Sequence, residues 1–273
     1  SGSKARFVYE VEDVQAIFFE KTFTAAIFRW LERRVLARTY LLVLMSPGFL
    51  RGYFEPTQKY KGASFVLENK IQLERPLPPP APDANIWRGV RDKWIIGWNG
   101  TLRCARSLEM LSAIAERLGD RVEIQTRGHP TETGVEQFLS IVNRHPNWRH
   151  GGEYKIPDDL ASMYGRVHFV WCFDFLDPNG NSPLLLACRM YQGGYYGAVP
   201  LVPTGSEMQR FLAPHGIGHA FDDPAIDRIC DFLTNLSWDD YVREREQVVS
   251  LGPDLFLDTG EDAQNLVALM TAR

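Results

Sequence analysis

Arg189 and Gln192 lie one helical turn apart in the segment from Gly180 to Val202, GNSPLLLACRMYQGGYYGAVPLV. A guanidinium is suited to phosphate because it offers paired N–H donors, and the glutamine amide beside it can both donate and accept hydrogen bonds. Ser182 and Pro183 are typical of an N-cap and a first helical residue, so we expect a helix to begin there. A start nearer Ala187 would still leave the two side chains one turn apart.

This expected helix has a polar and an apolar side. At about 100° per residue, Ser182, Arg189 and Gln192 share the polar side. The apolar stripe consists of Leu184, Cys188, Tyr191 and Tyr195. Because a helix N-terminus attracts anions, the polar side predicts a phosphate-binding surface. The alternative is a solvated helix face, although such faces usually carry more Lys and Glu.

A second candidate is the stretch GWNGTLR, which follows an expected buried strand. Glycines let the backbone approach a ligand closely, and the helix after the stretch offers its first N–H groups to an anion. The candidate ligand-binding residues of this stretch are Gly97, Asn99, Gly100, Thr101 and Arg103. The stretch does not match the GxGxxG dinucleotide fingerprint, and an ordinary turn explains its glycines almost as well.

Two further strand ends carry polar side chains. The sequence RGHP contributes Arg127 and His129, and EYKIPDDL contributes Tyr154 ahead of a helix that we expect to be capped near Pro157 and Asp158. His129 could bond a sugar or a base, or serve as a structural hydrogen-bonding group. Tyr154 alone is explained as well by ordinary aromatic packing. A fourth strand end is followed by FDFLDPNGNSP, from Phe173 to Pro183. If the strands are parallel, all four ends meet at one edge of the sheet, where sheets of this kind bind ligands.

No metal site is expected from the sequence. Asp174 and Asp177 resemble a metal-binding pair, but the Asp-Pro-Asn-Gly turn that contains Asp177 accounts for them without a metal. The four cysteines are scattered, with no CxxC pair and no histidine at ligand spacing, which argues against zinc and against a disulfide framework. This cysteine usage fits a reducing compartment.

Hydrophobic periodicity predicts alternating strands and helices over most of the chain. Expected strands cover residues 6–13, 39–46, 63–69, 93–98, 121–128, 166–173 and 199–203. Expected helices cover residues 23–38, 105–119, 134–146, 156–165 and 204–216, besides the one that contains Arg189. Such alternation is typical of βαβ units, so we expect an α/β fold with parallel sheets covered by helices.

Composition limits the function classes. The chain has 273 residues, of which 45% are hydrophobic and 23% charged, with a net charge of −4. This is an ordinary soluble composition without the basic excess of a nucleic-acid-binding protein, so no nucleic-acid partner is expected. No apolar run approaches the roughly 18 residues that a membrane span needs.

A proline-rich segment suggests a domain boundary. Five prolines fall within the seven residues from Pro76 to Pro82, which favours an extended linker. We therefore expect a partial N-terminal lobe at residues 1–75, a linker at 76–92, a Rossmann-like domain at 93–250 and a C-terminal helix at 251–273 that returns to the first lobe.

The motif NSPLLLACRMYQGGYYGAVPLV resembles the donor-binding segment of GT-B glycosyltransferases, especially bacterial enzymes of polysaccharide assembly with an N-S…R-x-Y-E-G-G pattern. The resemblance covers Lys93 to roughly Ser250, and the first 75 residues resemble the last third of a GT-B N-terminal lobe. It implies that residues 97–103 form a glycine loop near the diphosphate, that Asn181 and Ser182 contact the phosphates, and that Arg189 contacts the donor. Gln192 stands where relatives carry the glutamate that holds the nucleotide ribose.

The sequence departs from that family pattern at two positions. Gln192 replaces the second glutamate of an E-x7-E pattern, and Leu184 stands at the position of the first. Glutamine keeps a hydrogen-bonding group but loses the charge and one acceptor oxygen, so we expect Gln192→Glu to be tolerated. A GT-B site needs no bound metal if a helix dipole and an arginine stabilise the leaving diphosphate, so no cofactor is expected.

The implied activity is transfer of a sugar from a nucleotide-diphosphate sugar to a saccharide or lipid-linked acceptor, in polysaccharide or glycolipid biosynthesis. An inverting reaction needs a base, and Asp13, at the end of an N-terminal-lobe strand, is the candidate; a helix cap is an equal alternative. A non-catalytic GT-B-like binding or scaffold domain and, less favoured, a nucleotide-sugar epimerase are alternative functions.

The expected helix at 23–38 is basic as well as apolar. Arg29, Arg33, Arg34 and Arg38 are interleaved with Phe23, Ile27, Trp30, Leu31 and Val35. Such a helix can touch anionic lipid, so peripheral membrane contact through residues 22–38 is one expectation. A core helix with a solvated arginine face is the favoured alternative. The expected location is the cytoplasm, with the inner membrane surface as the site of any peripheral contact.

Overall fold

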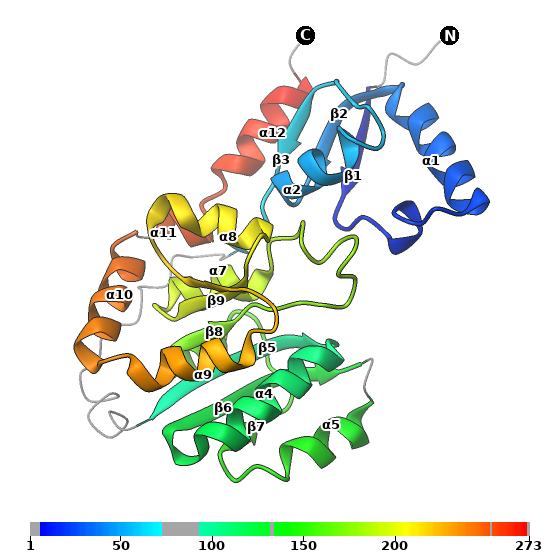
Figure 1. Ribbon diagram of the computed structural model, residues 1–273. Coiled ribbons are helices and arrows are strands. Elements are labelled where there is room, and N and C mark those ends of the chain that lie inside the picture. The colour runs from blue at the N-terminus through cyan, green and yellow to red at the C-terminus, as the bar shows by residue number, and fades with distance from the viewer. Residues whose placement is uncertain (1–5, 73–92, 132–133, 252, 272–273) are drawn as a thin grey trace. The chain divides into compact units, whose positions relative to one another are not determined.

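The computed structural model describes residues 6–72, 93–131, 134–251 and 253–271. The linker expected at 76–92 lies outside these residues. The chain divides into two compact units (Figure 1). Unit 1 contains residues 1–69, 177–186 and 258–273, and unit 2 contains residues 70–176 and 187–257. The ten-residue insertion 177–186 therefore packs with the N-terminal part of the chain.

Unit 1 is built on a three-stranded parallel sheet with the order β1-β2-β3. The strands are β1 (Phe7–Val11), β2 (Thr39–Leu44) and β3 (Ser64–Val66), joined by α1 (Phe23–Leu36) and by the short turns η1 (Ala16–Phe18), α2 (Pro47–Phe49) and η2 (Leu50–Phe54). The core gathers the apolar residues Val11, Val14, Leu36, Leu42, Leu44, Phe49, Tyr53, Phe54 and Tyr60. These residues come from every strand connection, so the unit folds around one centre.

The C-terminal helix α12 (Glu261–Thr271) belongs to unit 1. Tyr40 donates its hydroxyl hydrogen to the carbonyl oxygen of Leu269 at 3.2 Å, and Arg6 donates to that of Met270 at 3.4 Å. The apolar stripe of this helix is not buried there, because Leu269 and Met270 remain exposed. The helix is thus held by polar contacts at its C-terminal end.

Unit 2 contains a six-stranded parallel sheet with the order β10-β9-β8-β5-β6-β7. The strands are β5 (Trp94–Leu102), β6 (Val122–Pro130), β7 (Trp148–His150), β8 (Phe169–Trp171), β9 (Val199–Pro203) and β10 (His219–Phe221). A two-stranded ladder also joins β4 (Ile71–Gln72) to β11 (Leu257–Asp258). The parallel α/β architecture expected from the alternating pattern is confirmed. Strand order reverses between β5 and β8, which defines the edge where sheets of this kind bind ligands.

Helices connect the strands of unit 2 (Figure 1). They are α4 (Ala105–Leu118), α5 (Val135–Val142), α6 (Leu160–Tyr164), α7 (Cys188–Tyr195), α8 (Glu207–Leu212), α9 (Ile226–Asn235), α10 (Trp238–Ser250) and α11 (Pro253–Phe256), with the short turns η3 (Gly119–Arg121) and η4 (Ala213–His215). Helix α7 packs tightly on the sheet, because a Cβ at Gly193 would meet the side chain of Val170 in β8. The GG pair of the motif is thus a packing feature.

Two sequence expectations about element boundaries are wrong. The start expected at Ser182 is wrong and the alternative start near Ala187 is confirmed, since α7 begins at Cys188 with Ala187 as its N-cap. The hydroxyl of Ser182 accepts from the backbone N–H of Asp177 at 2.9 Å and closes a turn instead of capping a helix. The stretch at 97–103, expected as a loop, continues strand β5 to Leu102 and stays paired with β6 up to Pro130. The polar residues at 97–102 therefore lie on a strand, Asn181 and Ser182 lie in a turn, and Arg189 and Gln192 lie on α7.

Candidate functional site

The ends of β5 and β6 approach each other closely at two glycines. Gly100 and Gly128 have φ angles of 111° and 125°, and a Cβ at Gly128 would overlap the carbonyl oxygen of Gly100. Only glycine fits both the backbone conformation and the close approach. Gly97, in contrast, is buried within β5 against Val167. Of the two candidate glycines, Gly100 therefore shapes the strand ends together with Gly128, and Gly97 serves packing.

Arg189 places a desolvated guanidinium at the start of α7. Its Nη1 is buried without a hydrogen-bond partner, and no ion pair to it is found among the described residues. Burial raises the pKa of the Cys172 thiol to about 12, and burial also raises the pKa of Tyr154; the charge of Arg189 partly offsets both effects. The guanidinium is thus surrounded by neutral groups, an arrangement that favours an added anion.

Gln192 lies one turn further along α7 and is buried. Its Oε1 accepts a hydrogen bond of 3.0 Å from the hydroxyl of Tyr164, at the end of α6. Tyr164 also bonds to Asn99, whose Oδ1 accepts from the backbone N–H of Arg127 at 3.0 Å. A continuous buried polar network therefore joins α7, α6, β5 and β6.

The Arg127 side chain supports the chain that follows β7. Its Nε donates to the carbonyl oxygen of Gly152 at 3.2 Å and its Nη2 to that of Glu153 at 2.7 Å. The guanidinium also lies 3.6 Å from Asp159. These bonds fix the backbone beside Tyr154, whose hydroxyl lies over Gly100. Arg127 thus acts on the site by positioning its neighbours.

The remaining candidates of unit 2 are more exposed. The His129 side chain is 60% exposed and lies 3.6 Å from Glu153. Thr101 is exposed at the end of β5. Arg103 lies 3.7 Å from Asp174, whose other oxygen accepts from the backbone of Leu176. Asp174 therefore has an arginine partner, and no cluster of three or more metal-ligating side chains occurs in the part of the chain that the structure describes.

Three candidates belong to unit 1. The Nδ2 of Asn181 donates to Asp13 at 2.7 Å, and its Oδ1 accepts from the backbone N–H of Val14 at 3.0 Å. Asp13 itself is exposed. The Ser182 hydroxyl holds the turn at Asp177. The side chains of Asn181 and Ser182 are thus engaged in local structure rather than turned to a ligand.

Sequence reasoning missed Tyr164 and Cys172 as neighbours of Arg189. Tyr164 ends a short apolar helix and Cys172 directly follows a buried strand, so the sequence at both positions is typical of core packing. A positional signal was available for Cys172, because a residue that follows β8 stands at the C-terminal edge of the sheet. A buried residue at that edge that carries a polar atom is a candidate member of a hydrogen-bond network.

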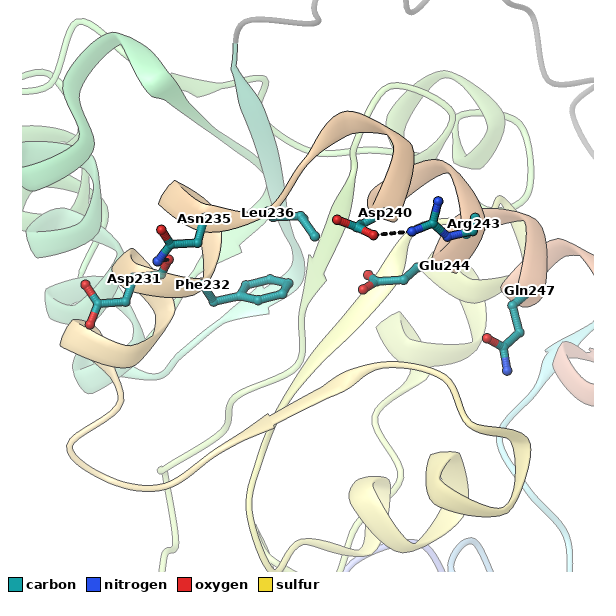
Figure 2. A pocket seen from close by; sticks show the side chains of 8 residues that line it. All are labelled: Asp231, Phe232, Asn235, Leu236, Asp240, Arg243, Glu244 and Gln247. Atoms are coloured by element: carbon teal, nitrogen blue, oxygen red, sulfur yellow. Dashed lines mark hydrogen bonds and ion pairs between the residues drawn. The ribbon is translucent and has the colours of Figure 1, made fainter.

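Two grooves border the sheet of unit 2. One, of about 580 Å³, runs past Asn99 and Arg127 and is lined mostly by polar residues of β5, β6 and α6. The other, of about 500 Å³, lies between α9 and α10 (Figure 2). Figure 2 shows Asp240 paired with Arg243, and Glu244 bonds to His219 at 2.8 Å. The lining of the second groove contains three carboxylates, on Asp231, Asp240 and Glu244, against one arginine that is paired with Asp240, so the groove does not suit a phosphate.

Solved structures share this fold at low sequence identity. Anabaena Alr3699/HepE, in complex with UDP and glucose, matches with a TM-score of 0.70 and 9% identity over 98% of this chain and 72% of that chain. WaaG, a glycosyltransferase involved in lipopolysaccharide biosynthesis, matches with a TM-score of 0.65 and 12% identity over 99% and 76%. No family model matches the chain. These matches show the fold that the motif predicted, that of the GT-B glycosyltransferases.

A curated relative is more similar in sequence. The succinoglycan biosynthesis protein ExoL of Rhizobium meliloti (strain 1021) is 31% identical over 275 residues, which cover 97% of this chain and 66% of ExoL. This chain thus spans about two thirds of that relative's length. Among the helices that the structure describes, none has the length and hydropathy needed to cross a bilayer.

Proposed function

We propose that the C-terminal edge of the unit 2 sheet binds the diphosphate of a nucleotide-diphosphate sugar, and that this chain takes part in transferring the sugar to a saccharide or lipid-linked acceptor. The pathway class proposed is polysaccharide or glycolipid assembly, since ExoL is a succinoglycan biosynthesis protein. The observation that carries the proposal is the buried, unpartnered Nη1 of Arg189. Leaving such a donor unpaired is costly, so a ligand oxygen there gains a charge-assisted bond.

The chemistry asked of Arg189 is stabilisation of the leaving group. When the glycosidic bond to the donor phosphate breaks, negative charge accumulates on the departing diphosphate oxygens. The guanidinium and the first N–H groups of α7 are fixed before the reaction, so they favour this charge without reorganising. We propose that these groups serve without a bound cofactor or metal.

For Asp13 we propose the role of general base toward the acceptor hydroxyl in an inverting transfer. Its carboxylate is exposed, so an acceptor can reach it, and its bond to Asn181 fixes its orientation.

Isothermal titration with UDP and related nucleotide diphosphates tests the donor site. Arg189→Ala should weaken binding about ten- to a hundredfold, since a charge-assisted hydrogen bond contributes about 1.5–3 kcal/mol. The melting temperature of the ligand-free protein should stay nearly unchanged. Arg144→Ala, at an exposed position on the same unit, is the control and should bind as wild type does. Equal binding by Arg189→Ala would place the site elsewhere, and absence of binding by wild type would favour a scaffold function.

We further propose peripheral membrane contact through residues 22–38. The apolar side chains of α1 are not buried in unit 1 as a core helix requires: Phe23 is 82% exposed and Trp30 49%. The inward side of the helix instead carries Ala25, Glu32 and Leu36. The Arg34 guanidinium stacks over the Trp30 ring at 4.3 Å, so a basic and an apolar group face outward together. Such a face suits an anionic lipid surface.

Liposome flotation tests this contact. Wild type should float with vesicles that contain anionic lipid and should stay soluble with neutral vesicles. The double substitution Phe23→Ser and Trp30→Ser should abolish flotation. Protein that remains in the soluble fraction with anionic vesicles would contradict the proposal.

A further inference from the structure

The amide of Asn99 has a fixed orientation. A backbone N–H can only donate, so the atom that faces the N–H of Arg127 at 3.0 Å must be the oxygen Oδ1. The amide nitrogen of Asn99 therefore points the other way, toward Tyr164. Both Asn99 and Tyr164 are buried, which leaves little freedom for another arrangement.

Tyr164 continues the same direction of hydrogen-bond donation, away from Arg127. Burial raises the pKa of the Tyr164 hydroxyl, and the bond with Asn99 offsets this only in part, so the hydroxyl stays protonated. Because the oxygen of Asn99 already accepts from Arg127, its amide nitrogen is the donor in that bond and the Tyr164 oxygen accepts. Its single hydrogen is left for the next partner, which lies 3.0 Å away on Gln192.

The oxygen of Gln192 is consequently occupied. Because Tyr164 donates, the atom of Gln192 that it meets is the acceptor Oε1. The other end of the amide, Nε2, has no hydrogen bond among the described residues and is not sealed from solvent. Gln192 therefore presents two N–H donors at the C-terminal edge of the sheet, one turn from the unpartnered Nη1 of Arg189.

We infer that Gln192 is a specificity-determining residue that donates a hydrogen bond to an acceptor oxygen of the ligand. The chain of hydrogen bonds from Arg127 through Asn99 and Tyr164 engages the oxygen of Gln192 and so leaves its amide nitrogen for the ligand. This inference rests on the proposed donor site. A glutamate here would instead accept from ligand hydroxyls. The fitting ligand group is a phosphoryl, ether or hydroxyl oxygen that offers a lone pair, and a ligand donor hydrogen is not required.

This polarity reverses the expectation that Gln192→Glu is tolerated. The carboxylate would keep one oxygen on Tyr164 but would turn the second toward the ligand acceptor, where lone pairs face each other and no hydrogen lies between them. The substitution preserves size, so its effect reports polarity and charge rather than packing.

The ligand test is titration with UDP at pH 7.5 and pH 5.5. At pH 7.5, Gln192→Glu should weaken binding about tenfold or more, the effect of replacing a donor by a charged acceptor. At pH 5.5 part of the loss should be recovered, since a protonated carboxyl can donate. Gln137→Glu adds the same charge at an exposed position on α5 and should bind as wild type does at both pH values. Binding by Gln192→Glu that equals or exceeds wild type at pH 7.5 would overturn the inference.

A ligand-free test separates this inference from the proposed function. In NMR spectra of the free protein, the side-chain amide hydrogens of Asn99 should exchange slowly and those of Gln192 rapidly. Tyr164→Phe should speed the exchange at Asn99. Slow exchange at Gln192 in wild type would mean that its amide nitrogen is already bonded, which overturns the inference. If wild type binds no UDP, the proposed function fails and this measurement alone decides the polarity of Gln192.

Discussion

Asn181 bonds to the residue pair Asp13–Val14 through both ends of its side-chain amide, at 2.7 and 3.0 Å. The backbone N–H of Val14 can only donate, so it fixes the oxygen of Asn181 and turns the amide nitrogen toward Asp13. A residue that the family resemblance assigns to phosphate binding thus orients the candidate base. The turn that carries it is closed by Asp177, which accepts from the backbone N–H of Asn181 at 3.0 Å.

Asn181→Ala should lower the free energy of unfolding by about 1–3 kcal/mol, because it leaves the buried N–H of Val14 unpaired. Urea unfolding measures the change. Asn179→Ala, at an exposed position in the same turn, is the control and should change stability by less than about 0.5 kcal/mol. Equal stability of the two variants would show that the bond seen at Val14 contributes little.

Gly128→Ala should destabilise the protein more than any glycine change made for backbone conformation alone. Its φ of 125° is unfavourable for alanine, and the added Cβ would overlap the carbonyl oxygen of Gly100. Gly134→Ala is the matched control, since Gly134 has a φ of 73° but open space around a Cβ. We expect about 1–3 kcal/mol for the control, because its φ of 73° and ψ of 149° form a backbone conformation nearly restricted to glycine. Gly128→Ala should cost more than the control, because the overlap with Gly100 is added to the backbone strain. Similar unfolding free energies for both variants in urea would contradict the steric argument.

Much of the fold could be predicted from local patterns. Helix α4 runs from Ala105 to Leu118 and ends at Gly119, as its apolar period and glycine stop indicate. Strands β7 and β10 were missed because their sequences, WRH and HAF, lack the continuous apolar run that marked the equally short β8, FVW. The start of α7 was misplaced because Ser182 uses its hydroxyl in a turn that depends on Asp177.

The candidate site was predictable only in part. Arg189 and Gln192 stand out because polar residues interrupt an apolar run. The role of Tyr164 depends on which atom it meets across the sheet edge, and a single sequence carries no such information. Residue types in the sequence thus identify candidate site residues, whereas the direction of their hydrogen bonds can be assigned only from the folded structure.

The buried carboxyl of Glu32 should make unit 1 less stable as pH rises. Burial raises the pKa of Glu32, although bonds from Tyr53, Gln58 and Tyr9 partly oppose the shift. A carboxyl with a raised folded pKa contributes stability that is complete below the unfolded value of 4.5 and is lost as pH rises through the folded pKa. The difference in unfolding free energy between wild type and Glu32→Gln should therefore shrink from pH 4.5 to pH 7.5. Urea titrations at both pH values measure it, with the exposed Glu12→Gln as control; a constant difference would contradict the prediction.

The buried imidazole of His168 should have the opposite effect in unit 2. Its Nδ1 accepts from the backbone N–H of Ile95 at 2.8 Å, and aromatic rings surround it. Burial, followed by the charge of Arg245, lowers the pKa of His168 from 6.5 to about 3. Between pH 6.5 and pH 3, His168 is therefore protonated in the unfolded chain but neutral in the folded protein. The stability present above pH 6.5 is lost as pH falls toward 3.

His168→Gln tests this dependence, because glutamine can still accept from Ile95 but does not titrate. Between pH 6.5 and pH 5, the loss of unfolding free energy in wild type should exceed that in the variant by up to about 1.4 kcal/mol per pH unit. Urea unfolding followed by tryptophan fluorescence suits the measurement, since Trp94 and Trp238 pack around the imidazole. His129→Gln, at an exposed site, is the control and should keep the wild-type slope. Parallel pH dependences of wild type and His168→Gln would mean that the imidazole accepts its proton in the folded state, against the burial that the aromatic cluster imposes.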